Sequence, residues 1–250
     1  MKIRTIAVAV TFAAGLSPLG AMAQDKAPAV VPVELFACTF KEDKGWKDLD
    51  SVNKRFAKWS KKNDGSYSAW TISPQFRQND GEFDVGWIGS WATGAEMGKG
   101  MDNWMSGNDG IGEDFGDVID CSHSLVSSVP VHAPKGPPKS DGIVWFSSCT
   151  LEEGSDSRKA FEAHKKFSSM MADMGGKGQA WLMYPVFGFS DIKFDYYSVV
   201  SFDNYGELGE AWHNYTNGGG YAKHQQTMAG VASCDSPRVY DAKVVVLGSD

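Results

Sequence analysis

The sequence predicts an α+β fold made of two tandem copies of one βαββαβ unit. The chain matches itself at a shift of 111 residues without a gap, and both matching halves show the same order of strand and helix patterns. Each half contains two cysteines, and the separation between them is nearly the same in both halves. We therefore interpret the 250 residues as two copies of one plan behind an N-terminal extension.

The internal repeat is clearest at rare residue types. Of the 70 residues at positions 38–107, 18 recur 111 positions later, whereas chance at ordinary composition gives about four or five. The matches include Cys38 with Cys149 and Trp70 with Trp181. The number of identities indicates an internal duplication.

The first copy is expected to span residues 32–132. A strand precedes a helix in which Phe56 and Trp59 recur at helical spacing, and Gly65 follows that helix as a left-handed cap. Two strands, a second helix from near residue 92, a glycine-rich loop and a last strand come next. The expected strands are 33–40, 67–76, 83–91 and 123–132, the first helix is about 47–62, and the loop is 107–116.

The second copy, 142–250, repeats this order after a linker at 133–141 that is rich in proline. Its second helix begins near Tyr205, where Asn204 is a candidate cap. A short glycine-rich loop follows at 218–220. The expected strands are 143–151, 179–187, 194–202 and 238–247, and the first helix is 157–174.

The order β-α-β-β-α-β is that of the ferredoxin-like unit, which carries its helices on one sheet face only. We therefore expect the open faces of the two sheets to pack against each other. In element order and duplication the chain resembles the dimeric α/β-barrel superfamily, which includes antibiotic-biosynthesis monooxygenases, haem-degrading enzymes and chlorite dismutase-like proteins. The resemblance implies that two ferredoxin-like units, packed sheet to sheet, form an intrachain pseudo-dimer, either as a monomer or within a higher oligomer. It identifies the fold much better than the activity.

The cysteines fit one disulfide in each copy. Cys38 and Cys149 lie late in the first strand, while Cys121 and Cys234 come just before the last strand, 83 and 85 residues further on. The first and last strands of a ferredoxin-like sheet are antiparallel neighbours. We therefore predict the pairs Cys38–Cys121 and Cys149–Cys234. Free thiols or a metal site are the alternatives, although no CxxC or CxxCH spacing is present.

The N-terminus has the pattern of a cleaved signal peptide. A basic start and an apolar run at 6–19 precede the small-x-small site at 21–23, and the run is short for a membrane span. We expect residues 1–23 to be removed, 24–31 to form a flexible leader, and the protein to be periplasmic, with the extracellular space as the alternative. Loss of Lys2 and Arg4 takes the net charge from −7 to −9. This charge disfavours nucleic acid and anionic membrane surfaces as partners.

Candidate catalytic residues are few. Asp84 and Asp195 occupy matched positions in apolar strands, where a carboxylate that faces a central cavity could act as a base with a raised pKa. A hydrogen bond to a neighbouring loop is the plainer interpretation. His213, beside a glycine-rich loop, could be a general base or a haem ligand, or simply an exposed histidine. No HxH or HExxH pattern is present, so no metal site is predicted.

An aromatic set is the strongest indication of a ligand site. If the space between the sheets is open, these rings would form a pocket for a flat, apolar ligand; otherwise they fill the core. Two matched amides could orient such a ligand, or could act as caps or loop tethers. The expected ligand-binding residues are Trp70, Trp87, Trp91, Trp181, Tyr184 and Tyr196, with Asn103 and Asn214.

Tryptophan is unevenly distributed, with six in the first copy and three in the second. A pocket is therefore expected to be built unequally by the two copies. Met97, Met101 and Met105 recur at intervals of four residues, a spacing that suggests copper in an exported protein but is more typical of the core face of a helix.

Three function classes remain open at this point. The first is an exported protein that binds a small apolar or aromatic molecule between the repeats, without a cofactor. The second, implied by the superfamily resemblance, is a cofactor-free or haem-dependent oxygenase-type enzyme. The third is a structural or stress-related envelope protein with a filled core. The sequence carries no catalytic signature that selects among them.

Overall fold

The computed structural model describes residues 29–77 and 83–248. Within these ranges the chain forms nine strands and six helices. The first half contains β1 (Val31–Phe40), α1 (Trp46–Asn63), β2 (Ser68–Phe76), β3 (Val85–Ser90), α2 (Gly94–Ser106), α3 (Ile111–Val118) and β4 (Ile119–His132). The second half contains β5 (Gly142–Leu151), α4 (Ser157–Asp173), β6 (Gln179–Phe187), β7 (Tyr196–Phe202), α5 (Tyr205–Thr216), α6 (Gly220–Met228), β8 (Ala232–Cys234) and β9 (Arg238–Val246).

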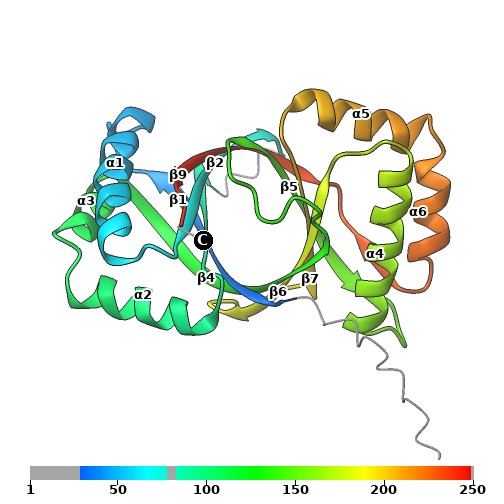
Figure 1. Ribbon diagram of the computed structural model, residues 1–250, viewed down its shortest axis with the longest axis horizontal. Helices are drawn as coiled ribbons and strands as arrows, with labels where there is room; N and C mark the ends of the chain where they lie inside the picture. Colours follow the sequence, from blue (N-terminus) through cyan, green and yellow to red (C-terminus); the bar gives the residue numbers. More distant parts are fainter. Residues whose placement is uncertain (1–28, 78–82, 249–250) are drawn as a thin grey trace, which may run out of the picture.

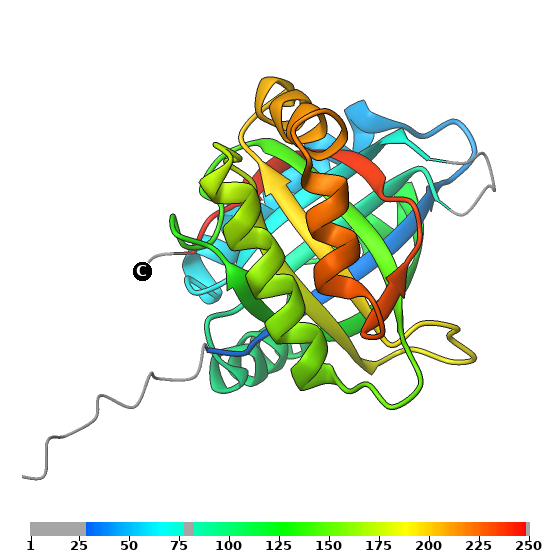
Figure 2. The same ribbon diagram turned by 90° about the vertical axis from the view of Figure 1, so that its right-hand side faces the viewer.

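The strands form one antiparallel sheet that closes into a barrel. Its order is β7-β6-β4-β1-β3-β2-β9-β5, and β5 pairs with β7 to complete the ring. The short strand β8 adds to β5 beside β9. Figure 1 shows the barrel end-on, with α1, α2 and α3 on one flank and α4, α5 and α6 on the opposite flank. Figure 2 shows α4 and α6 lying over the outer surface of the strands.

The two halves join through the edges of their sheets. Strand β4 pairs with β6, and β2 pairs with β9, so the four barrel strands of each half continue into those of the other. The α/β barrel expected from the sequence is therefore present, and the two sheets meet at their edges as well as across the shared interior. An open edge leaves backbone N–H and C=O groups unpaired, and closing the ring satisfies them.

The interior of the barrel is filled with side chains from both halves. These residues are mostly β-branched or aromatic, as expected for positions that alternate inward along each strand. The buried members of this cluster are Val33, Ile72, Val126, Val144, Phe146, Met183, Val199 and Tyr240. The space between the two halves is therefore a packed core.

The main difference from the predicted elements lies in the first glycine-rich segment. A loop was expected at 107–116, but α3 begins at Ile111 after Gly110, whose φ of 74° is left-handed. Ile111 and Val118 are buried on one face of this helix, and Phe115 packs against the same core. Burial of that face outweighs the low helix propensity of its two glycines. In the second half, α6 likewise begins within the glycine-rich segment at 218–220, at Gly220.

Both predicted disulfides are present. Cys38 lies directly opposite Cys121 in the β1–β4 pairing, and Cys149 lies directly opposite Cys234 in the β5–β8 pairing. Because β4 begins at Ile119, Cys121 is inside the strand and not just before it. In the first half the pair joins the first and last strands, as expected, whereas in the second half Cys234 lies on β8, the short strand that precedes β9 and pairs with the end of β5.

Residues 1–28 lie outside the described ranges, and they contain the expected signal peptide and most of the leader. Among the residues that are described, no helix is long and apolar enough to cross a membrane.

Candidate functional site

A cavity of about 520 Å³ lies in the first half, between the outer face of the barrel and the three helices that cover it. Strands β1, β3 and β4 form its floor, and α1, α2 and α3 form its roof. Met105, which is 77% exposed, lies at its rim. The lining includes four indole rings, called here the cavity tryptophans: Trp59, Trp87, Trp91 and Trp104.

Helical periodicity brings the roof residues together. Phe56 and Trp59 lie one turn apart on α1, and Met101, Trp104 and Met105 share one face of α2. The ring of Phe56 makes edge-to-face contacts with Trp87, at 5.3 Å between centroids, and with Trp104, at 5.9 Å. Such contacts hold the rings in a fixed arrangement. The cavity is therefore walled by ordered aromatic side chains.

A chain of hydrogen bonds crosses the floor of the cavity. The Tyr67 hydroxyl donates to Oε1 of Glu34 and accepts from Nε1 of Trp87 at 2.7 Å. The other oxygen of Glu34, Oε2, lies 2.9 Å from Nε2 of His123, whose ring stacks on Phe36 at 3.9 Å. Glu34 and Tyr67 are 7% and 3% exposed, whereas His123 is at the surface. The chain thus links a buried phenol to solvent through a buried carboxylate.

Burial keeps the phenol of this chain protonated. It raises the pKa of Tyr67 well above its ordinary value, and the neighbouring carboxylate of Glu34 raises it further. The hydroxyl therefore remains a donor to Glu34. A Cβ on Gly89 would collide with the Tyr67 hydroxyl and with Oε1 of Glu34. A glycine at this position allows the buried bond to form.

A second polar pair lies at the end of α1. Oδ2 of Asp64 accepts from Nε1 of Trp91 at 2.9 Å, and Oδ1 accepts from the hydroxyl of Ser66 at 3.1 Å. Helix α2 approaches this pair at Gly100, where a Cβ would meet the Asp64 carboxylate and the Trp91 indole. The close approach of α2 to Asp64 and Trp91 thus depends on a residue without a side chain.

We expect Gly100→Ala and Gly98→Ala to change stability in opposite directions. Both residues are in α2, but Gly98 is exposed with open space around it. Alanine at Gly98 should stabilise the helix by about 0.5–1 kcal/mol. Alanine at Gly100 should cost about 1–3 kcal/mol, because it forces Asp64 and Trp91 apart. Urea unfolding curves of both variants measure the difference, and equal midpoints would contradict the described packing.

The corresponding region of the second half contains a buried hydrophobic cluster. Tyr196 and Leu182 are completely buried there, and Nε2 of His164 lies 3.0 Å from the Tyr196 hydroxyl. Burial lowers the pKa of His164 to about 4, with the neighbouring His224 as a smaller cause, and raises the pKa of Tyr184 to about 12. The two halves therefore differ: the first encloses a cavity where the second has a packed core.

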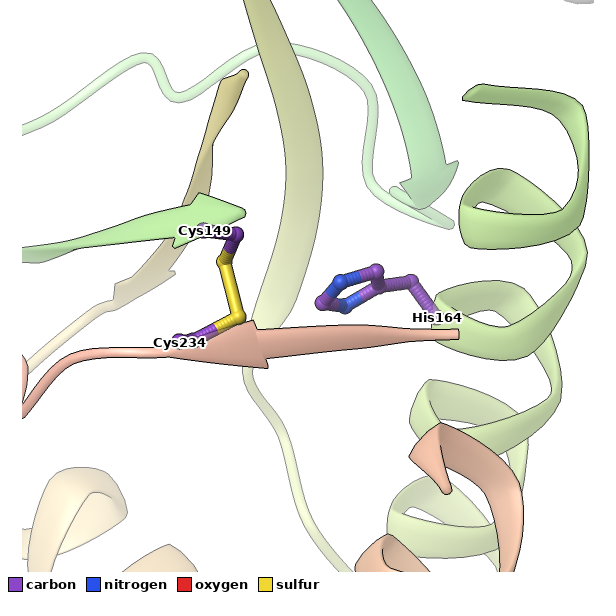
Figure 3. Close-up of side chains that lie close together, drawn as sticks. All are labelled: Cys149, His164 and Cys234. Carbon is purple, nitrogen blue, oxygen red and sulfur yellow. A yellow bond between two sulfur atoms is a disulfide. The ribbon is translucent and has the colours of Figure 1, made fainter. Parts of the chain in front are cut away.

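The disulfide of the second half lies beside His164, which points toward it from α4 (Figure 3). One donor atom from each of Cys149, His164 and Cys234 lies within 4.8 Å of the others, an arrangement that could hold a metal ion. The two sulfur atoms are bonded to each other, however. Zinc and copper bind thiolates, and the disulfide leaves none at this site.

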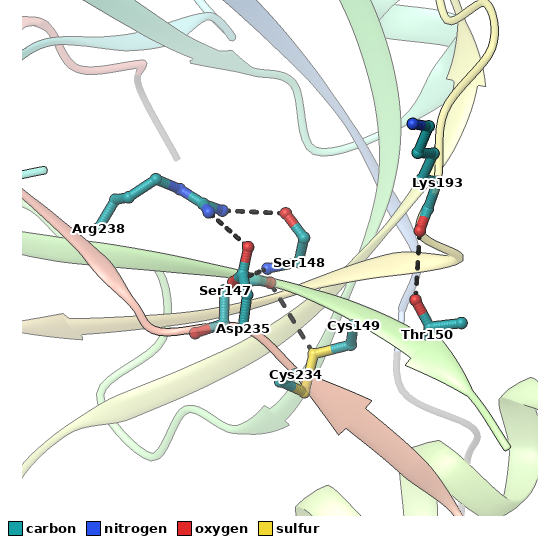
Figure 4. A network of polar contacts seen from close by, with 8 residues as sticks. All are labelled: Ser147, Ser148, Cys149, Thr150, Lys193, Cys234, Asp235 and Arg238. Carbon is teal, nitrogen blue, oxygen red and sulfur yellow. Dashed lines mark hydrogen bonds and ion pairs between the residues drawn. A yellow bond between two sulfur atoms is a disulfide. The ribbon is translucent and has the colours of Figure 1, made fainter. Parts of the chain in front are cut away.

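Polar contacts also hold β5 against the segment that joins β8 to β9 (Figure 4). Asp235 accepts from the backbone N–H of Ser148 at 2.7 Å and pairs with Arg238 at 2.6 Å. Arg238 also donates to the hydroxyl of Ser148 at 3.0 Å. These side chains bond to one another and to the backbone of β5, which indicates a structural role.

The predicted catalytic residues lie outside the cavity lining. Asp84 accepts from the backbone N–H of Phe40 at 3.0 Å, and Asp195 accepts from that of Leu151 at 2.7 Å. Both aspartates are exposed and fasten the first strand of their half to the third, so neither faces a central cavity as expected. His213 is exposed on α5, where its Nδ1 lies 3.3 Å from the amide of Asn217.

The predicted ligand-binding residues are divided among several places. Trp87 and Trp91 line the cavity, whereas Tyr184 and Tyr196 belong to the core of the second half. The indole N–H of Trp70 donates to the carbonyl of Ser140 in the linker, and Trp181 lies opposite Pro130 in the β4–β6 pairing; neither tryptophan lines the cavity.

The matched amides act as tethers. Nδ2 of Asn103 donates to the carbonyl of Asn63 at 2.6 Å, and Nδ2 of Asn214 donates to that of Met174 at 3.1 Å. Each amide joins the second helix of its half to the end of the first, as in the plainer interpretation from sequence.

Five important residues of the cavity were not predicted. Trp59 and Trp104 were missed because helical spacing does not distinguish a packed core from the roof of a cavity. Glu34 and His123 lie on β1 and β4, and Tyr67 directly precedes β2, so only the pairing of the sheet brings the three residues together. A buried glutamate in an apolar strand was the one signal available.

A closed eight-stranded antiparallel barrel with helices on two opposite flanks defines the dimeric α/β-barrel fold. Solved structures of that superfamily resemble the chain over most of its length. A putative monooxygenase from Lactobacillus acidophilus NCFM has a TM-score of 0.57 at 11% identity and covers 88% of this chain and 96% of its own. The putative chlorite dismutase TA0507 has a TM-score of 0.54 at 11% identity, with coverages of 86% and 94%.

A mutant chlorite dismutase from Candidatus Nitrospira defluvii also has a TM-score of 0.54, at 8% identity, and covers 87% of this chain and 93% of its own. No protein-family model and no curated protein sequence matches the chain. At such low identities the likeness establishes the fold alone.

Proposed function

We propose that this chain is an exported binding protein that holds a small, planar, largely apolar or aromatic molecule in the cavity of its first half. One observation carries the proposal: four indole rings surround about 520 Å³ of space, while the matching region of the second half is packed. Filling a cavity is ordinarily stabilising. A duplicated unit that keeps one copy open and fills the other is best explained by a ligand.

Differences between matched positions support this interpretation. At the 111-residue shift, Tyr67 is replaced by Gly178, Trp87 by Ser198 and Trp104 by Tyr215. These three cavity residues are therefore specific to the first copy. The residues that hold the fold, such as the cysteines and the amide tethers, are shared by both copies.

Two features of the chain support a binding protein that works outside the cytoplasm. The signal-like segment at 1–23 and two disulfides fit an oxidising compartment, for which we propose the periplasm. The edge-to-edge joining of the halves fits a duplicated ferredoxin-like unit that forms a pseudo-dimer within one chain.

Haem is the cofactor that the superfamily resemblance implies, and the cavity does not fit it. Haem carries two propionates, which need cationic or other donor groups. The lining contains the carboxylates of Glu34, Asp64 and Asp120 but neither lysine nor arginine. Its one histidine, His123, has Nε2 against Glu34, the ring nitrogen that usually binds iron in haem proteins. We therefore assign haem no role in this cavity.

A second candidate function rests on the Tyr67–Glu34–His123 chain. The buried carboxylate of Glu34 is hydrogen-bonded to His123 at the surface. It could take a proton from a bound molecule and pass it through His123 to solvent. Cofactor-free oxygenase-type chemistry would need such a base. This candidate uses the same cavity, and it would show as oxygen uptake that depends on the bound ligand.

Binding is tested with acridine, a planar aromatic probe that is neutral at pH 8. We expect saturable quenching of tryptophan fluorescence in the intact protein. Trp104→Ala should weaken binding about tenfold or more, because it removes one wall of the cavity. The control is Trp212→Ala, which removes an exposed indole from the matching helix α5.

A second variant separates loss of the site from loss of the fold. Met101→Trp places in the first half the residue found at the matched position of the second, and should block the cavity without creating a void. Unchanged acridine affinity in both cavity variants, with unchanged unfolding midpoints, would overturn the proposed site.

A further inference from the structure

The charged residues that line the cavity indicate the charge of its ligand, which the proposed function leaves open. This inference rests on the proposed function and concerns the same site. Three carboxylates lie in the lining, those of Glu34, Asp64 and Asp120, and the lining has no lysine or arginine. Most of the remaining surface is aromatic or sulfur-containing. An anionic molecule would meet repulsion here and no compensating cation.

Glu34 is the most deeply placed of these carboxylates. It is 7% exposed, and its contacts are the neutral hydroxyl of Tyr67 and the imidazole of His123. Asp64 accepts hydrogen bonds from an indole N–H and from a hydroxyl, both of which are neutral. Among the described residues, no lysine or arginine forms an ion pair with either carboxylate. Neither carboxylate therefore has a permanently charged partner in the described part of the chain.

The helices around the opening add to this negative field. Residues 94–123, which include α2 and α3, contain seven acidic residues and one lysine. The matching residues 205–234 contain two acidic residues and one lysine. One of the seven, Asp114, pairs with Arg55. The acidity is therefore specific to the half that has the cavity, and such a field raises the local concentration of cations.

Aromatic faces and carboxylates together favour one kind of ligand. The faces of tryptophan rings attract cations through the ring quadrupole, most strongly where water is excluded. A buried carboxylate supplies the counter-charge. We propose that the cavity selects planar aromatic cations, with the ligand ring against the cavity tryptophans and its charge balanced by Glu34 and Asp64.

Three probes of one shape and different charge test this proposal at pH 8: 10-methylacridinium, acridine and acridine-9-carboxylate. We expect the cation to bind about tenfold or more tightly than acridine, and the anion more weakly than either. Glu34→Gln with Asp64→Asn should lower the affinity for the cation toward that for acridine. The readout is the ratio of the affinities for the cation and for acridine, which should fall in the double variant because both amides keep hydrogen-bond acceptors but carry no charge.

Glu210→Gln is the matched control, because it removes one exposed charge from the second half, on α5. It should leave all three affinities unchanged. Equal affinities of the intact protein for cation and acridine would overturn the charge selection and leave the proposed binding function standing. A preference for the cation that survives in the double variant would overturn the role of the two carboxylates. Failure of all three probes to bind would count against the proposed function itself.

Discussion

Replacing Cys149 and Cys234 by serine is expected to lower the free energy of unfolding by about 4 kcal/mol. The bond joins residues 85 positions apart, and without it the unfolded chain gains the conformational freedom of that long loop. Cys149 is also completely buried, so the serine hydroxyl would need a partner in an apolar core. Urea unfolding at pH 7, followed by far-ultraviolet circular dichroism, measures the change.

The other disulfide provides the comparison. Its residues are 83 positions apart, so Cys38→Ser with Cys121→Ser should destabilise the fold by a similar amount. Cys38 and Cys121 line the cavity, whereas Cys149 and Cys234 do not. Binding of acridine should therefore weaken in the first pair of variants only. A loss of stability below about 1 kcal/mol in both pairs would contradict the structural role of the disulfides.

Lowering the pH from 6.5 to 4 is expected to destabilise the protein by about 3 kcal/mol through His164 alone. The pKa of this histidine is about 4 in the folded protein, because of burial, and 6.5 is its ordinary value. Between these two values the unfolded chain binds a proton that the folded protein does not, so stability falls as the pH falls. At pH above 6.5 the effect is absent.

His164→Gln isolates this contribution. The glutamine amide can still reach the Tyr196 hydroxyl but does not titrate, so the variant should lose less stability than the intact protein between pH 6.5 and 4. His213→Gln is the control, because His213 is exposed on α5. Parallel plots of unfolding free energy against pH for the intact protein and His164→Gln would show that His164 is not buried as described.

The sequence predicted the fold wherever a repeated local pattern was sufficient. The spacing of Cys38, Cys121, Cys149 and Cys234 led to both disulfides, because the first and last strands of each half are neighbours. Helix α3 was missed because its glycines favour a loop, and only the burial of its apolar face in the tertiary structure makes it a helix. The closing of the barrel depends on which edges meet, a choice that strand patterns do not encode.

The site was predicted only in part, for a related reason. The excess of tryptophan in the first copy indicated an unequal pocket, and the described cavity lies in that copy. The cavity was expected between the repeats, but Ile72 and Phe146 help to fill the barrel interior there. The cavity lies instead between the barrel and the helices that cover it. Glu34 and His123 are 89 residues apart and meet only through the β1–β4 register. The tryptophan content can indicate that a cavity exists, but the strand pairing determines where it lies.

The most direct test of the proposed binding site is a ¹⁹F NMR titration with acridine of protein labelled with 5-fluorotryptophan, with resonances assigned by single Trp→Phe substitutions. We predict that the resonances of the cavity tryptophans shift with saturation while those of the second half stay in place. Shifts confined to the second-half tryptophans, or no shifts at all, would contradict the proposed site. The second-half tryptophans are Trp145, Trp181 and Trp212.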